Sequence, residues 1–336
     1  MKVFEIRDGF GLDRLFAVER PDPQPGPGQV LLRMKAASLN YRDLLMVKGL
    51  YNPRQPLPLI PCSDGVGEVA AVGEGVGRFG VGDRVATLFH QSWVGGPATH
   101  DKVRSTLGGP LDGTLAEYVV LPASGVISVP EHLTDVEAAT LPCAALTAWS
   151  ALATFGNVRA GDVVLVLGTG GVSLFALQLA VALGARVIVT SSSDHKLETA
   201  RKLGSWKEIN YKQDPQWGKT VKQLTGGAGV DHVVEVGGAG TLAQSLRALR
   251  VGGQISLIGV LAGHAVELDI LPIVMGNVRV QGILVGSRDS FEAMNRAIAR
   301  HRIRPVIDRV FPFDEAREAM VYMTGQRHVG KVCIEI

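Results

Sequence analysis

The residues with the clearest chemical signature are Gly168, Gly170 and Ser173, which have the spacing of a phosphate-binding turn. In such a turn the first glycine allows a tight bend, and the second lets the backbone approach a pyrophosphate. The third residue must be small so that the following helix can pack on the preceding strand. Ser173 meets that requirement, and its hydroxyl can bond backbone nearby. The helix N-terminus directs its free amides and positive dipole end at the phosphate.

The turn lies between a strand-like run and a helix-like run, and a second strand-like run follows, which is the context that makes the pattern informative. We therefore predict a dinucleotide site at this turn. The competing interpretation is a glycine-bearing turn that binds no ligand. The predicted phosphate contacts are Gly168, Thr169, Gly170, Gly171 and Val172.

The end of the second strand-like run indicates which dinucleotide is bound. Sites for NAD usually place Asp or Glu there, about 20 residues past the turn, on the ribose 2′-hydroxyl. Here the segment 190–193 reads TSSS, and no carboxylate precedes Asp194, which we expect to begin a helix. Hydroxyls of Ser191 and Ser192, with Lys196, can instead hold a 2′-phosphate, so NADP(H) is favoured. The alternative is a polar loop of helix-capping serines and a solvated lysine.

The elements that must position this site change in character along the chain. Strand-like runs separated by Gly and Pro fill the first third, which favours a β-barrel-like domain. They cover residues 28–39, 67–76, 82–89 and 113–122, and a helix is expected after Asn40. Beyond Pro130, strands alternate with helices, which predicts a doubly wound parallel α/β sheet. After residue 290, two amphipathic helices precede a closing strand that can return to the barrel.

Composition excludes several classes of protein. The 336 residues carry a net charge of +2, so neither a nucleic-acid footprint nor a polybasic membrane tail is indicated. The most apolar window, 163–189, is interrupted by glycines and by polar residues, unlike a membrane span. Three cysteines far apart in sequence predict neither a disulfide framework nor a cysteine-cage zinc site. We expect a reduced, cytoplasmic enzyme with a small-molecule substrate.

Motifs in both halves of the chain support one family. They are SLNYRDLLMVKGLYNPRQP, IPCSDGVGEVAAVGEGV, GTLAEYVVLP, LPCAALTAWSAL, VLGTGGVSLFALQLA and GVDHVVEVGG. In this order they resemble the medium-chain dehydrogenases and reductases, especially the zinc-free, quinone-oxidoreductase-like branch. The resemblance implies a GroES-like barrel from 1–124 and 290–336 around a Rossmann domain at 125–289. It also implies a cofactor cleft between the domains, and commonly a dimer.

The resemblance also identifies the positions where zinc members of the family hold a catalytic metal. Those positions here are Asn40, the segment 62–64 (Cys-Ser-Asp) and Cys143. One thiol and two weak oxygen groups do not make the N/S ligand set that catalytic zinc prefers. The loop that carries the structural-zinc cysteines in the family has none here, although it contains His90 and His100. We predict that no zinc is bound.

Further site residues are implied by the same resemblance. Lys196 and the tyrosine of the INY segment, Tyr211, match residues that hold the 2′-phosphate in zinc-free NADPH members. The predicted cofactor contacts are completed by Thr147, Gly237, Gly259 and Lys331. Asn40 and Tyr51 are the candidate catalytic donors, since this branch lines its cleft with that segment. Alternatively, Asn40 caps a helix and Tyr51 packs its ring on the domain.

Without a metal, there is no strong Lewis acid to activate an alcohol. Conjugate reduction needs only a hydride, hydrogen-bond donors for the developing enolate and a proton source. We therefore predict an NADPH-dependent reductase of a quinone or an α,β-unsaturated carbonyl. The alternatives are an alcohol/carbonyl dehydrogenase and a nucleotide-binding scaffold without turnover. The segment 278–284 is a plausible sheet edge, through which we expect the protein to form a homodimer.

Overall fold

The computed structural model describes residues 1–265 and 267–336, which form two compact units. One unit comprises Met1–Leu146 with Gly286–Ile336, and the other comprises Thr147–Val285. The expectation that both chain ends build one domain around an inserted domain matches this division. The first boundary lies at 146/147, later than the predicted 124/125, because Val126–Ser128, Asp135–Ala138 and Leu141–Ala145 all contact strands of the barrel sheet. The second lies at 285/286 and not at 289/290.

The barrel unit is built on one sheet of seven strands, in the order β14-β15-β3-β4-β5-β7, with β6 paired to β3, and β1 and β2 form a separate two-stranded sheet. Its central strand β3 is long, and alternate side chains along it enter a core shared with β1 and β4. The C-terminal strand β15 runs antiparallel to β3, with Val332 opposite Leu39. This pairing brings the end of the chain beside residues 39–40. The strands are β1 (Lys2–Ile6), β2 (Leu15–Glu19), β3 (Gln29–Leu39), β4 (Asp64–Val72), β5 (Arg84–Thr87), β6 (Tyr118–Pro122), β7 (Val126–Ser128), β14 (Ile307–Pro312) and β15 (Lys331–Glu335).

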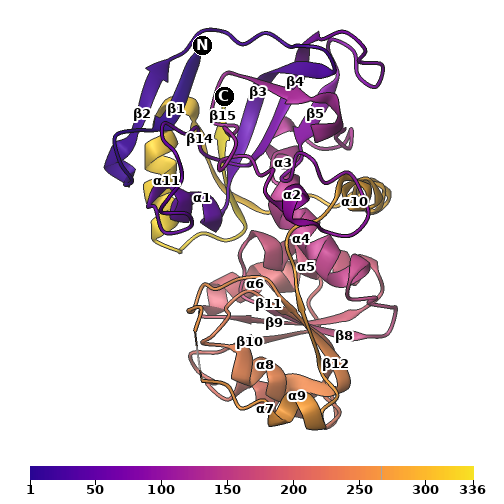
Figure 1. Ribbon diagram of the computed structural model, residues 1–336. Helices are drawn as coiled ribbons and strands as arrows, with labels where there is room; N and C mark the ends of the chain where they lie inside the picture. The colour runs from indigo at the N-terminus through magenta and orange to yellow at the C-terminus, as the bar shows by residue number, and fades with distance from the viewer. Residues whose placement is uncertain (266) are drawn as a thin grey trace. The chain divides into compact units, whose positions relative to one another are not determined.

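Helices α3 and α11 pack against strands of this sheet, and α1 packs against α11 (Figure 1). The expected helix after Asn40 is α1, and Asn40 is its N-cap residue. The two expected C-terminal helices are also present, as α10 and α11. The helices are α1 (Tyr41–Val47), α2 (His100–Val103), α3 (Asp135–Ala138), α10 (Arg288–His301) and α11 (Ala316–Thr324), with a π-helical turn η3 at Leu141–Ala145.

The second unit is a parallel sheet of six strands in the order β10-β9-β8-β11-β12-β13. Numbered from β8, this is the 3-2-1-4-5-6 order of the dinucleotide-binding fold. Helices α5 and α6 cover one face of the sheet, and α7 and α8 cover the other (Figure 1). The strands are β8 (Val163–Leu167), β9 (Arg186–Ser191), β10 (Lys207–Asn210), β11 (Val230–Glu235), β12 (Leu249–Leu257) and β13 (Arg279–Gly282). The helices are α4 (Leu146–Trp149), α5 (Gly171–Ala182), α6 (Asp194–Lys202), α7 (Trp217–Leu224), α8 (Leu242–Ala248) and α9 (Leu271–Met275).

Strand β13 is the edge of this sheet, as predicted from the segment 278–284. It pairs with β12 on one side, and the topology within the described residues gives it no second neighbour. Val280 on the strand is 40% exposed, and the neighbouring helix α9 exposes Val274 and Met275. An unpaired edge beside apolar side chains is a surface that proteins usually cover or pair.

One helical stretch, Asp135–Thr154, is long and apolar enough to cross a membrane by length and composition. Within the protein, 72% of its most apolar window is buried. Burial of that kind is what a core helix of a globular domain requires, so the stretch is weak evidence for a membrane span.

Candidate functional site

The glycine turn follows the central strand β8 and leads directly into α5. Gly168 adopts a left-handed φ of 77°, a conformation that glycine tolerates best. Gly170 is the N-cap residue of α5, and a methyl group added there would meet no atom within 4 Å. The first amides of the helix therefore adjoin open space that a pyrophosphate can fill, and they have no carbonyl partners within the helix. The turn fits the phosphate site predicted from the sequence.

Ser173 replaces the third glycine without loss of packing. It is 2% exposed, and its hydroxyl donates to the carbonyl oxygen of Leu167 at 2.7 Å. The bond links the first turn of α5 to the end of β8. The expected backbone contact of Ser173 is therefore present, and it ties helix to strand beside the turn.

The predicted 2′-phosphate residues lie at the carboxyl ends of two adjacent strands. Ser191 ends β9 and Asn210 ends β10, and the two are paired in register. The backbone N–H of Tyr211 donates to the carbonyl of Ser191 at 3.0 Å, which places Tyr211 beside the serine segment. Lys196 lies in the first turn of α6. The structure therefore brings Ser191, Ser192, Lys196 and Tyr211 to one edge of the sheet.

The nearest carboxylate on this edge is engaged within the protein. Asp194 begins α6, as predicted, and its two oxygens accept from Asn210 (2.8 Å) and Gln213 (3.1 Å). A carboxylate held by two side-chain amides has less capacity for a ribose hydroxyl. This arrangement agrees with the absence of an acid at the end of β9.

A residue that sequence inspection missed, Glu235, shapes the loop after β11. Its buried carboxylate accepts from the backbone amides of Gly237 (2.8 Å) and Gly238 (3.0 Å). It also accepts from the hydroxyls of Thr241 (2.6 Å) and Ser245. Four donors fix the loop at the carboxyl edge of the sheet. The available signal was the single acid within the apolar run HVVEVGG.

Gly237 and Gly259 are required for the packing of their loops. A methyl group at Gly259 would lie 2.2 Å from the carbonyl oxygen of Val236, and one at Gly237 would lie 2.3 Å from Oγ1 of Thr241. Both loops follow strands at the carboxyl edge. Their contact with a cofactor stays a prediction, as does that of Thr147, which is buried in α4.

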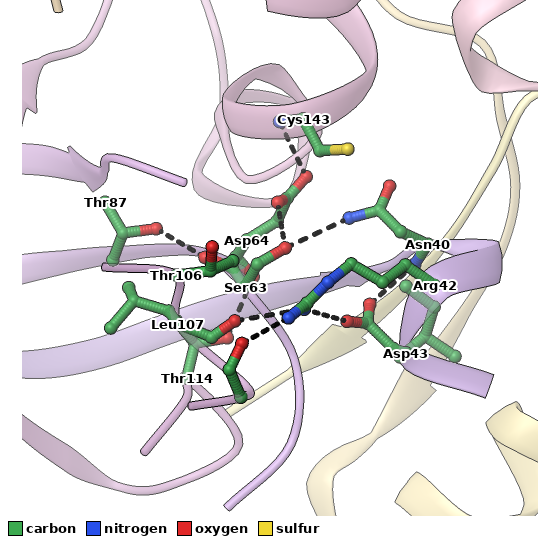
Figure 2. A network of polar contacts seen from close by, with 12 residues as sticks. Asn40, Arg42, Asp43, Ser63, Asp64, Thr87, Thr106, Leu107, Thr114 and Cys143 are labelled. Carbon is green, nitrogen blue, oxygen red and sulfur yellow. Dashed lines mark hydrogen bonds and ion pairs between the residues drawn. The ribbon is translucent and has the colours of Figure 1, made fainter. Parts of the chain in front are cut away.

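In the barrel unit, Asn40 is the centre of a buried polar network (Figure 2). Its side-chain amide donates to Oγ of Ser63 at 3.4 Å, and Ser63 in turn donates to Asp64 at 2.7 Å. The other oxygen of Asp64 accepts from the backbone N–H of Cys143 at 3.1 Å. Lys331 donates from Nζ to Oδ1 of Asn40 and to the carbonyl of Leu39, both at 2.6 Å. Residues from four segments of the chain thus form one hydrogen-bonded network that includes the amide of Asn40.

Lys331 was predicted as a cofactor contact, and the structure places it beside Asn40. It is 4% exposed, and both of the hydrogen bonds from its ammonium are to barrel residues. Its contact with a cofactor stays a prediction. Its position next to a candidate catalytic residue was not predicted from the sequence.

Two buried carboxylates adjoin this ammonium. Burial raises the pKa of Asp43 to about 6, because desolvation of the carboxylate outweighs the attraction of Arg42 and Lys331. Burial also raises the pKa of Asp64, while Lys331 opposes the shift. Asp43 accepts the backbone N–H of Asn40 at 2.8 Å and so fixes the start of α1. The two acids and two cations form a compact, nearly balanced group of charges.

The side chains at the predicted metal-ligand positions do not fit zinc. Asn40 presents its oxygen to the ammonium of Lys331, and a second cation there would be repelled. Burial and the negative charge of Asp64 raise the pKa of the Cys143 thiol, whereas a zinc ligand must be a thiolate. Ser63 supplies a hydroxyl where zinc would require a stronger donor. Within residues 1–265 and 267–336, no three His, Cys, Asp or Glu side chains are grouped so that they could hold a metal.

Tyr51 lies next to the start of α1 even though it follows that helix in sequence. The guanidinium of Arg42, in the first helical turn, lies 4.8 Å from its ring centroid. The same guanidinium lies 5.3 Å from the ring of Phe89 and donates to the carbonyls of Leu107 (3.1 Å) and Gly109. Tyr51 is 50% exposed, so its hydroxyl is accessible. Its ring is therefore held against the side chain of Arg42 by a cation–π contact.

The ring of His90 packs against the ring of Phe89. The ring centroids of Phe89 and His90 are 4.8 Å apart, and Nδ1 of His90 lies 3.1 Å from Oγ1 of Thr106. Burial and the charge of Arg42 lower the pKa of His90 to about 4, so the imidazole is neutral at pH 7. His100, the other histidine of this loop, begins α2 on the surface. Neither histidine belongs to a group of metal ligands among the described residues.

Two family patterns match the chain. The alcohol dehydrogenase GroES-like domain matches residues 26–131, and the zinc-binding dehydrogenase domain matches residues 171–300. A zinc-type alcohol dehydrogenase-like protein of Schizosaccharomyces pombe is 47% identical over 97% of this chain and 96% of its own length. An acryloyl-coenzyme A reductase of Sulfurisphaera tokodaii is 29% identical over 94% of this chain and 95% of its own length.

Solved structures resemble the whole chain. A protein of Sinorhizobium meliloti described as an alcohol dehydrogenase is 44% identical with a TM-score of 0.92, and the match covers 100% of this chain and 98% of that one. An NAD-dependent alcohol dehydrogenase is 34% identical with a TM-score of 0.92 over 100% of both chains. A mycobacterial protein in complex with NADPH is 29% identical with a TM-score of 0.83 over 100% of both chains.

Proposed function

The chain belongs to the medium-chain dehydrogenase/reductase superfamily of oxidoreductases, and we propose that it uses NADPH to reduce a quinone or an α,β-unsaturated carbonyl without a metal. One observation carries the proposal. A buried ammonium, Lys331, is bonded to the side chain that stands at the first metal-ligand position, Asn40. Positive charge is thus supplied by the protein where zinc members of the family hold an ion.

Conjugate reduction requires only hydrogen-bond donors and a proton source from the protein. When bound, the reduced nicotinamide supplies a hydride to the β-carbon, and the C=C electron pair moves toward the carbonyl oxygen. Asn40 has an amide N–H that can donate to the oxygen as it becomes an enolate. The hydroxyl of Tyr51 can deliver the proton that completes the reduction, because a phenol donates while neutral near pH 7. For a quinone, the same hydride and proton give the hydroquinone.

The preference for NADP(H) is supported by the residues at the ends of β9 and β10. Ser191, Ser192, Lys196 and Tyr211 lie together there, and Asp194 is held by two side-chain amides. A cation and hydroxyls suit a 2′-phosphate, whereas a ribose hydroxyl is best held by a free carboxylate. Similar proteins include one named as NAD-dependent and one in complex with NADPH. Comparison of the two cofactors on the purified protein is therefore a direct test.

We also propose that the protein is a homodimer and works in the reducing cytoplasm. The exposed edge β13 and the apolar surface of α9 support pairing with a second copy. Its three cysteines, Cys62, Cys143 and Cys333, are all free thiols, as expected in a reducing compartment.

The alternative function, oxidation of an alcohol with a catalytic metal, is favoured by the names of several relatives. Elemental analysis of the purified protein separates the two. The proposal expects no stoichiometric zinc, and NADPH-dependent reduction of 2-cyclohexen-1-one or 9,10-phenanthrenequinone that survives a chelator. Stoichiometric zinc, with oxidation of a primary alcohol that is lost on chelation, would contradict it.

A further inference from the structure

The side-chain amide of Asn40 has its orientation fixed by its partners. Lys331 carries donors and no acceptor, so only the oxygen of the amide can face it. The amide nitrogen must then face the other way, where Ser63 accepts one of its two N–H groups. The assignment of oxygen and nitrogen in this amide therefore follows from the chemistry of the lysine.

The bonds around Asn40 all run in one direction. Lys331 donates to Asn40, Asn40 donates to Ser63, and Ser63 donates to Asp64. The charge-assisted first bond, at 2.6 Å, draws electron density toward the amide oxygen and so strengthens the amide N–H groups as donors. The amide of Asn40 also bonds to Asp64, and its bond to Ser63 is long at 3.4 Å, so an N–H group can turn to a substrate oxygen. Asn40 retains 9% exposure, so this donor can be reached by a substrate.

We propose that Lys331 is a positioning residue for the reduction: it holds Asn40 with an N–H group directed at the enolate oxygen and supplies the positive charge that balances the buried acids. The inference rests on the proposed function for the identity of that oxygen. Lys331 acts through Asn40 and need not touch the substrate. The role differs from a contact with the cofactor, which would act on affinity for NADPH.

The balance of buried charges also supports this role for Lys331. Asp43 and Asp64 are both fully buried, and Lys331 opposes the rise in the pKa of each. An enolate forming beside two carboxylates would be repelled without a nearby cation. Arg42 is the other cation in the cluster, but its guanidinium donates to the carbonyls of Leu107 and Gly109. Lys331 is the cation bonded to the donor itself.

The test is a double-mutant cycle on Lys331→Met and Asn40→Leu, with NADPH and 2-cyclohexen-1-one as probes. Methionine keeps the length of the lysine and removes its charge, and leucine keeps the size of the asparagine and removes its N–H donors without adding a charge. We expect Asn40→Leu to lower kcat by about 100- to 1,000-fold, as for loss of one oxyanion donor, and Lys331→Met to lower it by up to the same factor. The loss of kcat in the double variant should be much smaller than the product of the two single losses, since the lysine acts through that amide. The half-buried Lys35→Met is the matched control and should retain wild-type kcat.

The pattern of kinetic constants separates positioning from cofactor binding. The inference predicts a loss in kcat at nearly constant Kd for NADPH. A rise in Kd for NADPH with unchanged kcat, or effects that multiply in the double variant, would overturn it. Equal melting temperatures are not required, because a purely structural role for Lys331 would lower kcat by the same factor in the Asn40→Leu background as in the wild type.

A second readout needs no turnover and so keeps the inference separate from the proposed function. The side-chain amide signals of Asn40, identified by their loss in Asn40→Leu, are followed in a proton–nitrogen correlation spectrum. They should shift in Lys331→Met and stay in place in Lys35→Met. An unshifted amide in Lys331→Met would overturn the inference, even in a protein that reduces neither probe. Conversely, a shifted amide in such a protein would support the inference while the proposed function fails.

Discussion

Asp43→Asn should make the stability of the protein less sensitive to pH. The pKa of Asp43 is raised to about 6 from an ordinary value of 3.8, because its carboxylate is desolvated. In the folded protein the charged form of this carboxyl is therefore disfavoured. The stability that the protonated carboxyl contributes is fully present below pH 3.8 and is lost as the pH rises through about 6. Asparagine cannot ionise, so it removes this loss while keeping an oxygen for the backbone N–H of Asn40.

The magnitude follows from the shift of about 2 pKa units. At about 1.4 kcal/mol per unit, ionising Asp43 costs roughly 3 kcal/mol in total, of which about 2 kcal/mol falls between pH 4.5 and pH 8. The free energy of unfolding of Asp43→Asn minus that of the wild type should increase by that amount across this range. Any change in packing adds a constant that does not depend on pH. Thermal midpoints should diverge by about 4–8 °C.

Thermal unfolding followed by circular dichroism at pH 4.5, 6 and 8 measures this difference. Asp101→Asn is the control, because Asp101 is exposed in the first turn of α2. Its midpoint should follow the wild type at every pH. A difference for Asp43→Asn that stays constant, or that decreases as the pH rises, would refute the assignment of a buried carboxylate that is costly to ionise.

Further substitutions test the remaining parts of the site. Lys196→Ala should weaken binding of NADPH by about 1.5–3 kcal/mol and leave NADH nearly unchanged, since only NADPH carries the extra phosphate; equal losses in fluorescence titrations would contradict this. Tyr51→Phe should lower the rate of enone reduction by about 10²- to 10⁴-fold at constant melting temperature, with Tyr118→Phe as control, and unchanged turnover would return Tyr51 to a packing role. Val280→Lys on the exposed edge should turn a homodimer into a monomer in light scattering, and a wild-type monomer at micromolar concentration would disprove the edge pairing.

Local chemistry explains why the glycine turn between β8 and α5 could be predicted from the sequence. The positions of Gly168, Gly170 and Ser173 are fixed by the bend, the start of α5 and the packing of α5 on β8, all within a few residues. The order of strands and helices in that unit follows from the same alternation along the chain. The edge position of β13 was also predicted correctly, since it comes last in the series.

Long-range pairing explains what could not be predicted. Lys331 lies 291 positions from Asn40 in sequence, and only the pairing of β15 with β3 brings the two together. The unit boundary lies 22 residues later than expected, because β7, α3 and η3 all contact strands of the barrel sheet that come earlier in the sequence. The role of Glu235 depends on four donors that are brought together only in the folded loop, so it could not be predicted from the spacing of residues in the sequence.

The most direct test of the central claim is the fate of the hydride in metal-free protein. Protein treated with a chelator and verified free of zinc is incubated with deuterated NADPH, labelled at the transferable position of the nicotinamide, and 2-cyclohexen-1-one. The account predicts cyclohexanone with deuterium at the carbon β to the carbonyl. Deuterium on the carbinol carbon of an allylic alcohol, or turnover that returns only with added zinc, would contradict it.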